Sequence, residues 1–311
     1  MPATHDHLLA LCAVPPGRRL RLSRRDPAAT LDPEFESLKG ATLKKRALEL
    51  LDESRHALSR VQELLWASDS HSVLVVLQGM DAAGKDGMVK HVMAGLNPAG
   101  CEVHAFKTPS GEELAHNFLW RYWQRVPARG RIGIFNRSYY EEVLVVRVHP
   151  ALLAGERRPR GAQGAALWAE RFEDINQFER HLARNGTLIV KFFLHLSKAE
   201  QRRRLLERLE ARAKRWKFSA ADLRERDYWR DYVAAYESML GATSTPWAPW
   251  YVIPADHKYV ARSVVASILA SRIDALGLRF PRPGAAEARA LDAARRRLER
   301  EGGGAGRRAR R

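Results

Sequence analysis

The sequence predicts an α/β fold in which a parallel sheet is covered by helices on both faces. After about residue 70, short apolar runs alternate with segments of helical periodicity, a pattern typical of βαβ units. The first of these runs, residues 72–78, leads directly into a glycine-rich turn and a helix start. A chain of 311 residues with 45% hydrophobic residues is long enough for one large domain with appendages, or for two small domains.

The first 70 residues precede this alternation. Residues 1–33 form an irregular basic segment with an arginine cluster. From 34 to 68, apolar residues such as Leu43, Leu51 and Leu58 recur at helical spacing, which predicts one long helix or a helical pair packed on the main domain.

Five strands and six further helices follow. The run Ile-Gly-Ile-Phe marks a short strand before Asn136, and Asn185-Gly186 is a good C-terminal stop for a helix. We expect strands at 72–78, 102–106, 131–136, 188–196 and 251–254. We expect helices at 84–94, 112–126, 165–184, 198–209, 227–240 and 260–277.

Ligands of such sheets bind at the carboxyl ends of the strands, so functional loops should follow Gln78, Phe106, Asn136 and Leu196. The main domain is expected to span residues 34–280. Residues 281–311 are a basic tail that we expect to be disordered.

The chain is strongly basic. Its net charge is +17, of which the ten arginines and four acids of residues 282–311 contribute +6, so +11 remains on the rest. Such a charge attracts a polyanion: nucleic acid, an anionic membrane or an inorganic phosphate chain.

No apolar run reaches the roughly 18–20 residues of a membrane span, and the N-terminus lacks a secretory pattern. Cys12 and Cys101 give neither a disulfide framework nor metal-ligand spacing. We therefore expect a cytoplasmic protein with reduced thiols and no membrane association.

The glycine-rich turn reads Gly79-x-x-x-x-Gly84-Lys85 between a strand and a helix. The backbone N–H groups of such a loop wrap a phosphate chain, and the lysine adds a mobile charge. The expected phosphate- and nucleotide-binding residues are Gly79, Met80, Ala82, Ala83, Gly84, Lys85, Asp86 and Gly87.

Two acids set this loop apart from an ordinary ATPase loop. Asp86 stands where a Ser or Thr normally ligates Mg²⁺, and in the first helical turn it suits a capping or structural role. Asp81 lies within the cradle, where a carboxylate beside phosphate needs a cation between them. For Asp81 we expect a metal-linked or base role.

The third strand ends in Asn136 and continues into Arg137 and the pair Glu141-Glu142. The carboxylate that helps to hold Mg²⁺ in phosphate-loop enzymes usually stands at such a strand end. Glu141 or Glu142 could supply the missing charge, or both could be acids at a solvated helix start. Arg137 would grip phosphate oxygens.

A basic stretch with aromatics links two predicted helices near residues 209–226. It suits a lid that closes over phosphates, although a charge run is also typical of a solvated face. Its basic residues are Arg212, Lys214, Arg215 and Lys217.

Four motifs in this order resemble the polyphosphate kinase 2 family over residues 30–280. They are Gly79-Met-Asp-Ala-Ala-Gly-Lys-Asp-Gly87, Phe135-Asn-Arg-Ser-Tyr-Tyr-Glu-Glu142, Lys214-Arg-Trp-Lys-Phe218, and Ser244-Thr-Pro-Trp-Ala-Pro-Trp250 followed by Ile253-Pro-Ala-Asp-His-Lys258.

The resemblance implies a thymidylate-kinase-like fold and reversible transfer of the terminal phosphate of polyphosphate to a nucleoside mono- or diphosphate. It implies that Mg²⁺ is the cofactor, for which Mn²⁺ can substitute, and that Asp81, Lys85 and Arg137 are catalytic. The metal would be held by Asp81, Glu141 and Glu142. We also expect a homo-oligomer, a dimer or a tetramer, and no specific nucleic-acid partner.

Two departures from the family pattern stand out. Many members have Asp where this chain has Asn136, and the version seen here resembles the subgroup that phosphorylates both nucleoside mono- and diphosphates. Relatives also carry a proline before the lid's basic stretch, where this chain has Ala211-Arg212. Without that helix breaker, the preceding helix is expected to run on into the lid.

Two other functions fit part of the sequence. An ordinary nucleotide kinase with ATP as donor explains the loop but not Asp86 or the basic excess. A nucleic-acid-binding NTPase or RNA binder explains the charge, and it predicts salt-sensitive binding to RNA.

Overall fold

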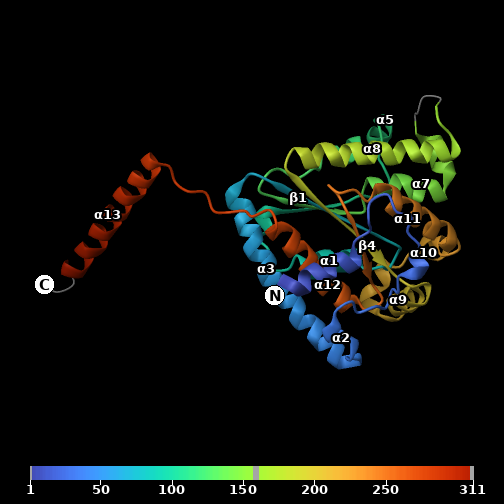
Figure 1. Ribbon diagram of the computed structural model, residues 1–311, viewed down its shortest axis with the longest axis horizontal. Helices are drawn as coiled ribbons and strands as arrows, with labels where there is room; N and C mark the ends of the chain where they lie inside the picture. Colours follow the sequence, from blue (N-terminus) through green and yellow to red (C-terminus); the bar gives the residue numbers. More distant parts are fainter. Residues whose placement is uncertain (1, 157–160, 309–311) are drawn as a thin grey trace. The chain divides into compact units, whose positions relative to one another are not determined.

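A five-stranded sheet forms the centre of the first of two units, Met1–Leu278; the second is Arg279–Arg311. The structure is a computed structural model that describes residues 2–156 and 161–308. The strand order is β2-β3-β1-β4-β5, and every pairing is parallel (Figure 1). The predicted fold class is therefore confirmed. The strands are β1 (Ser72–Gly79), β2 (Cys101–Ala105), β3 (Ile132–Asn136), β4 (Thr187–His195) and β5 (Trp250–Pro254).

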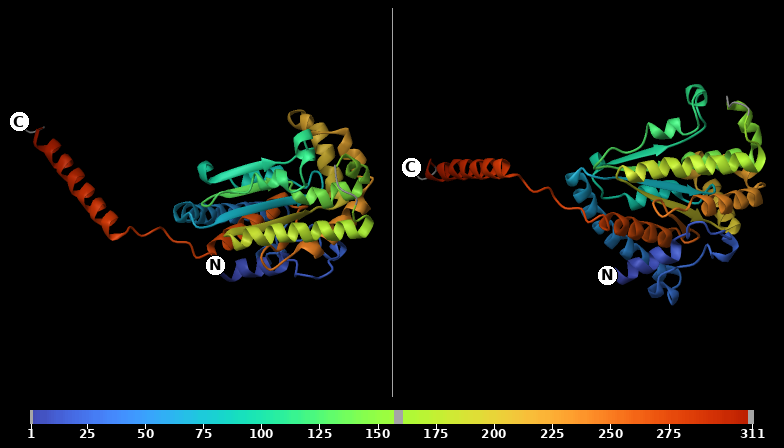
Figure 2. Two further views of the ribbon diagram at one scale, coloured as in Figure 1. Left: turned by 90° about the horizontal axis from the view of Figure 1, so that it is seen from above. Right: turned by 45° about the horizontal axis from the view of Figure 1, so that its top comes forward.

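Helices cover both faces of the sheet (Figure 2). On one face α3 (Gly40–Ser68), α4 (Lys85–Val92) and α12 (Lys258–Asp274) share a core with α1 (Pro2–Cys12). On the other face lie α8 (Gly164–Arg184) and α11 (Trp229–Thr243). The central strand is consequently buried on both sides.

The central position of β1 in the sheet explains its amino-acid sequence. Val73 and Val75 belong to the core under α3 and α12, whereas Leu74 and Val76 belong to the core under α8 and α11. A strand buried on both faces needs apolar residues at successive positions, which is why this run does not alternate.

The remaining elements of the first unit are short, apart from α9. They are η1 (Leu22–Arg24), α2 (Pro33–Glu36), η2 (Pro98–Gly100), α5 (Gly111–Ala115), α6 (Trp120–Trp123), η3 (Tyr139–Val143), α7 (Val145–Val148), η4 (Pro150–Gly155), α9 (Lys198–Glu210), η5 (Arg212–Lys217) and α10 (Ala220–Glu225). Among the described helices, none has the length and apolar character needed to cross a bilayer.

The N-terminal segment is more ordered than the sequence predicted. Residues Pro2–Cys12 form α1, and Leu8 and Cys12 are buried in the core. The chain then joins the sheet through a hydrogen bond from the Val14 amide to the carbonyl of Trp250. The expectation of an irregular segment was wrong for α1, because residues Pro2–Cys12 carry little helical periodicity of their own and are buried by packing against α12 and β5.

The predicted helix over 112–126 is divided into α5 and α6. Ser110 and Glu113 form a capping box that fixes the start of α5. His116 is extended, and the Asn117 side chain accepts a hydrogen bond from the Leu119 amide. Such local side-chain bonds compete with a continuous helix.

In the second unit, residues Ala285–Arg308 form helix α13 where disorder was expected. Alanine and arginine favour helix, and Arg295–Glu299 and Arg297–Glu301 form ion pairs one turn apart. Residues 309–311 of the expected tail lie outside the described part.

Candidate active site

The glycine-rich turn connects the carboxyl end of β1 to α4. A Cβ on Gly79 would lie 3.0 Å from the backbone oxygen of Leu194 in β4, so only glycine fits at that position. Gly84, just before α4, has φ 109°, and Ala82 also has a positive φ, 61°. These conformations wrap the chain tightly at the start of α4, where the positive end of the helix dipole favours an anion.

The Lys85 side chain is buried and folds back over the turn. Its Nζ donates hydrogen bonds to the carbonyl oxygens of Gly79 at 2.5 Å and Met80 at 3.3 Å. Burial, together with the positive charge of Arg137, lowers the pKa of Lys85 to about 8, although nearby carboxylates oppose the shift. The ammonium is thus held inside the loop with its charge only partly compensated.

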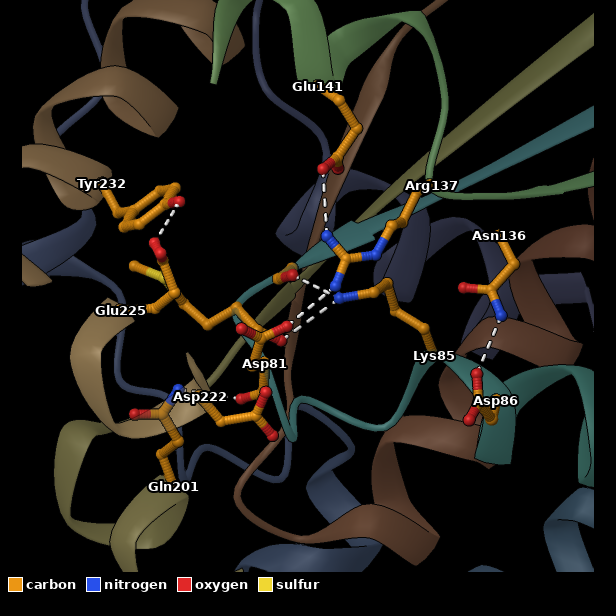
Figure 3. A network of polar contacts seen from close by, with 12 residues as sticks. Asp81, Lys85, Asp86, Asn136, Arg137, Glu141, Gln201, Asp222, Glu225 and Tyr232 are labelled. Atoms are coloured by element: carbon orange, nitrogen blue, oxygen red, sulfur yellow. Dashed lines mark hydrogen bonds and ion pairs between the residues drawn. The ribbon is translucent and has the colours of Figure 1, made fainter. Parts of the chain in front are cut away.

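Arg137 joins the loop to the end of β3. Its backbone has φ 66°, an uncommon conformation for a non-glycine residue, and its amide bonds the carbonyl of Leu77 at 3.1 Å. Nη2 donates to Oδ1 of Asp81 at 2.9 Å, and Nη1 donates to Oε2 of Glu141 at 3.0 Å (Figure 3). The charges of Glu141 and Asp81 raise the pKa of Arg137. One guanidinium therefore bridges two carboxylates from different loops.

A third carboxylate, Asp222 of α10, lies on the Asp81 side of this group (Figure 3). Burial raises the pKa of Asp222, and the charge of Asp81 raises it further, while Arg208, Arg137 and Lys85 lower it. Sequence reasoning missed this residue, because nothing in its local pattern distinguishes it from an acid at a helix start.

Glu142 is not part of this group. It is buried and accepts a hydrogen bond from the Tyr122 hydroxyl at 3.3 Å, with Arg171 at 3.9 Å. Burial raises the pKa of Glu142 to about 7. Of the two glutamates considered as metal ligands, only Glu141 contacts the residue that also binds Asp81.

The oxygen donors at this site suit a hard divalent cation such as Mg²⁺. Among residues 2–156 and 161–308, however, no three His, Cys, Asp or Glu side chains are arranged to hold a metal by themselves. Asp81 and Glu141 fit a metal that takes its other ligands from phosphate oxygens and water, as Mg²⁺ does in many phosphate-transfer sites.

Asp86 and Asn136 form a separate link between the loop helix and β3. Asn136 is the last residue of β3, and its Nδ2 donates to Oδ1 of Asp86 at 2.8 Å (Figure 3). This bond connects the first turn of α4 to the neighbouring strand. It gives Asp86 a structural contact at the position where Ser or Thr is usual.

The lid region departs from one expectation. α9 ends at Glu210, and Ala211 is extended with ψ 106°, so the helix does not run on into the basic stretch. Arg212 and Arg215 are exposed, and Nε of Arg215 donates to the carbonyl of Leu209 at 2.7 Å. The side chains of Lys214 and Lys217 lie outside what the structure describes.

The helix that leads into the lid also binds the phosphate loop. Gln201 Nε2 donates to the backbone oxygen of Asp81 at 2.8 Å. Nη1 of Arg204 donates to the carbonyl oxygens of Ala82 and Ala83 at 3.1 and 3.0 Å. No sequence pattern marks this contact, since α9 is charged on most of its surface.

A cavity of about 960 Å³ opens beside Arg137 and Glu141. The cavity lies over the carboxyl ends of β2 and β3, because its lining includes Phe106 and Lys107, which follow β2, and Arg137 and Glu141, which follow β3. Its other lining residues include aromatic, basic and acidic side chains, among them Phe106, Lys107, Phe118, Arg121, Tyr122 and Glu142. Its size is typical of pockets that bury a small organic ligand.

A glycine-rich phosphate loop on a parallel sheet, with a lysine, a bridging arginine and an adjoining ligand cavity, defines a P-loop phosphotransferase. The family model described as polyphosphate kinase 2 matches residues 42–280. The chain belongs to the polyphosphate kinase 2 family, and it is thus a kinase that transfers phosphate between polyphosphate and a nucleotide.

Two curated relatives are similar over most of their length. The chain is 52% identical over 252 residues to an ADP-polyphosphate phosphotransferase of Rhodopseudomonas palustris, covering 81% of this chain and 85% of the relative. It is 46% identical to an AMP/ADP-polyphosphate phosphotransferase of Meiothermus ruber, covering 87% and 94%.

A solved structure supports the fold. The crystal structure of polyphosphate kinase 2 from Arthrobacter aurescens TC1 matches with a TM-score of 0.80 at 38% identity, covering 92% of this chain and 96% of that one.

Proposed function

We propose that this protein transfers the terminal phosphate of polyphosphate to both AMP and ADP, reversibly and with Mg²⁺. The observation that carries the proposal is the position of Arg137, which binds Asp81 of the phosphate loop and Glu141 at the mouth of the cavity. A donor phosphate on the loop and an acceptor phosphate in the cavity would meet at this guanidinium. The relative whose name includes both AMP and ADP supports the wider acceptor range.

The donor side of the reaction would use the loop. Its backbone N–H groups and Lys85 would bind the terminal phosphates of the polymer. Because Lys85 is held by the carbonyls of Gly79 and Met80, its ammonium can turn to a phosphate oxygen without losing all of its partners. Phosphoryl transfer needs alignment and charge neutralisation more than a strong base.

The acceptor side would use the cavity. The rings of Phe106 and Tyr122, whose centroids are 4.5 Å apart, form part of the cavity wall, and a nucleoside in the cavity would bring its phosphates to Arg137. Arg121 is nearly buried, and its guanidinium lies over both rings. These side chains favour a flat, partly polar ring system.

Mg²⁺ bound by Asp81, Glu141 and the phosphate oxygens would neutralise charge as the two anions approach. For that to occur, Arg137 must release or share the two carboxylates that it now bridges. Arg137 would then turn its fork to the phosphates, where guanidinium binds two oxygens. Glu142 has no place in this set, because its partners are Tyr122 and Arg171.

Residues 209–226 would act as a lid. Asp222 of α10 already pairs with Arg208 at 3.5 Å, which keeps one end of the segment beside the loop. The exposed Arg212 and Arg215 would bind phosphates only after movement toward the loop, as lids do when substrate is present.

We also propose a cytoplasmic location, where AMP and ADP are available, and assembly into a homo-oligomer. Cys12 and Cys101 are free thiols, which accords with a reducing compartment. Light scattering on the purified chain measures the assembly directly.

The test is a matrix of AMP, ADP, GMP and GDP against polyphosphate with Mg²⁺, read out as nucleotide product. The expected result is ADP from AMP and ATP from ADP. A protein that transfers phosphate well from ATP to AMP but yields no product from polyphosphate would be an ordinary nucleotide kinase, and the proposal would be wrong.

A further inference from the structure

The helix of the second unit, α13, carries arginines along one of its faces. Arg289, Arg296 and Arg300 follow one another at intervals of seven and four residues. In a helix of 3.6 residues per turn, these intervals place the three residues within about 40° of arc. All three are exposed, and together they form the arginine stripe. The spacing continues in the sequence with Arg307, whose side chain lies outside the described part.

The arginines that flank the stripe are paired, whereas those of the stripe are not. Arg295 binds Glu299 at 2.9 Å, and Arg297 binds Glu301 at 3.1 Å. Within the described residues, no ion pair joins an arginine of the stripe to a carboxylate, although Asp292 lies about one turn before Arg296. The stripe is therefore a row of uncompensated positive charge.

Membership of the polyphosphate kinase 2 family does not account for this helix, because the family model ends at residue 280. Residues 279–284 connect the first unit to α13. Pro281 and Pro283 stand in this connection and prevent one helix from running through it. A charged helix on a short tether can add a second contact to a ligand that the main domain also binds, since that contact is then intramolecular.

The position of the apolar residues of α13 argues against a membrane surface as the partner. Leu291 and Leu298 are 56% and 67% exposed and lie about 180° around the helix from the arginine stripe. A basic helix that inserts its apolar face into a bilayer also has to bring its cations to the anionic headgroups. With these leucines inserted, the stripe would point toward water. The stripe suits a polyanion in solution instead.

Polyphosphate is the polyanion that the proposed function supplies. Guanidinium groups bind phosphate oxygens with pairs of N–H donors, and a linear polymer with a negative charge on every unit can follow a straight row of cations. We propose that the arginine stripe of α13 binds a part of the polyphosphate chain that the phosphate loop does not hold, and so retains long chains on the enzyme. This inference rests on the proposed function, because it takes polyphosphate as the donor.

Kinetics with ADP as acceptor test the inference. The donors are tripolyphosphate and a polyphosphate of about 100 units, which is long enough to occupy two binding sites at once. Arg296→Gln/Arg300→Gln should raise the KM for the long chain about threefold to tenfold at low salt, with kcat nearly unchanged, because exposed charge pairs are weak singly and act together. The KM for tripolyphosphate should stay within about twofold, since three phosphates on the loop leave none for α13.

The paired arginines of the same helix provide the matched control. Arg295→Gln/Arg297→Gln removes the same number of charges, yet it should raise the KM for the long chain by no more than about twofold. Arg296→Lys/Arg300→Lys keeps both charges of the stripe and should retain most of the affinity. Arginine, lysine and glutamine have similar helix propensities, so these changes act on charge rather than on the helix. A wild-type kcat with tripolyphosphate verifies that each variant is folded.

Direct binding compares polyphosphate with nucleic acid. The full-length protein, without nucleotide, is titrated with labelled polyphosphate and with single-stranded RNA of equal phosphate number over a series of salt concentrations. In Arg296→Gln/Arg300→Gln, binding of polyphosphate should become weaker and less dependent on salt, because fewer counterions are released for each bound chain. A larger loss of affinity for RNA than for polyphosphate would make α13 a nucleic-acid contact and overturn the proposal.

The kinetic outcomes are distinguishable. An unchanged KM for the long chain in Arg296→Gln/Arg300→Gln would show the inference to be wrong while the proposed function stands. An equal rise in the matched control would assign the effect to net charge, and an equal rise for tripolyphosphate would assign it to the phosphate loop; either result overturns the inference. If the wild type makes no product from polyphosphate of either length, the proposed function fails and the inference fails with it.

Discussion

The side-chain amide of Gln201 donates a hydrogen bond of 2.8 Å to the backbone oxygen of Asp81. The same side chain accepts a hydrogen bond of 2.6 Å from Arg226, which directly follows α10 in the lid region. One glutamine thus connects the backbone of the phosphate loop to the segment expected to close over it. A movement of residues 209–226 should therefore shift the backbone at Asp81.

Replacing Gln201 with Leu should lower kcat/KM about 10- to 100-fold, because a half-buried carbonyl loses its partner and the loop its support. The effect should appear in kcat as well as in KM, since the loop positions the reacting phosphate. Gln177→Leu on the exposed face of α8 is the matched control. Wild-type kinetics in the Gln201 variant would show that the contact has no part in catalysis.

Asp81→Asn should reduce Mg²⁺-dependent turnover by about 100-fold or more, because the metal of the proposed mechanism would lose a charged ligand at the reacting phosphates. Asp86→Asn in the same loop should cost less than about tenfold, since an amide can still bond Asn136. Steady-state assays over a Mg²⁺ titration give both values. Full Mg²⁺-dependent turnover in Asp81→Asn would remove the metal role from this residue.

Arg137→Lys should be strongly impaired even though the charge is kept. Lysine has no planar fork and cannot bridge Asp81 and Glu141, so we expect kcat to fall at least about 30-fold. The expected loss is the same for AMP and ADP as acceptors, because the proposed function places Arg137 where the two substrates meet. A variant impaired with only one acceptor would place Arg137 in acceptor selection instead.

The activity should fall on the alkaline side of pH 8. Lys85 has a folded-state pKa of about 8, so it is charged below that pH and loses its proton as the pH rises through it. The kcat/KM for polyphosphate, which reports the free enzyme, should then fall about tenfold per unit. In Lys85→Arg, whose side chain stays charged, the alkaline decline should move to higher pH even if the rate is lower. A decline that remains at pH 8 in that variant would assign it to another group.

The buried pair Lys191–Glu179 should dominate the stability of the face under α8. Both side chains are fully buried, their contact is 2.6 Å, and Lys191 also bonds the Tyr140 hydroxyl and the carbonyl of Thr243. Lys191→Met leaves the buried Glu179 carboxylate with its hydrogen bonds from Tyr139 and Tyr140 but without its cation, and should cost about 3–5 kcal/mol of unfolding free energy. The double variant Lys191→Met/Glu179→Gln should recover part of this in urea unfolding. A loss below about 1 kcal/mol in the single variant would contradict the prediction.

Much of the fold was predictable because its signals are local. The apolar run of β1, the glycine loop and the Asn185 helix end each depend on a few adjacent residues. The division between α5 and α6 could not be predicted. It depends on side chains such as that of Asn117, which accepts a backbone hydrogen bond in competition with a continuous helix. α1 was missed because its burial depends on α12 and β5, which are more than 200 residues away in the chain.

Prediction of the candidate active site is limited in the same way, because local signals were visible and distant contacts were not. The loop, Lys85 and Arg137 were visible because they follow strand ends in order. Glu141 and Glu142 are adjacent in sequence, yet η3 directs one to Arg137 and the other to Tyr122, and no pattern distinguishes them. Gln201, Arg204 and Asp222 act through contacts across the tertiary structure, so a single sequence gave no reason to select them.

The central strand β1 separates β3 and β2 on one side of the sheet from β4 and β5 on the other. The cavity is lined by residues that follow β2 and β3, whereas Gln201 and Arg204, which hold the backbone of the phosphate loop, belong to the helix that follows β4. Substitutions on the two sides share few partners, so their effects on free energy should add. An engineer could therefore change the lining of the cavity and keep the support of the phosphate loop intact.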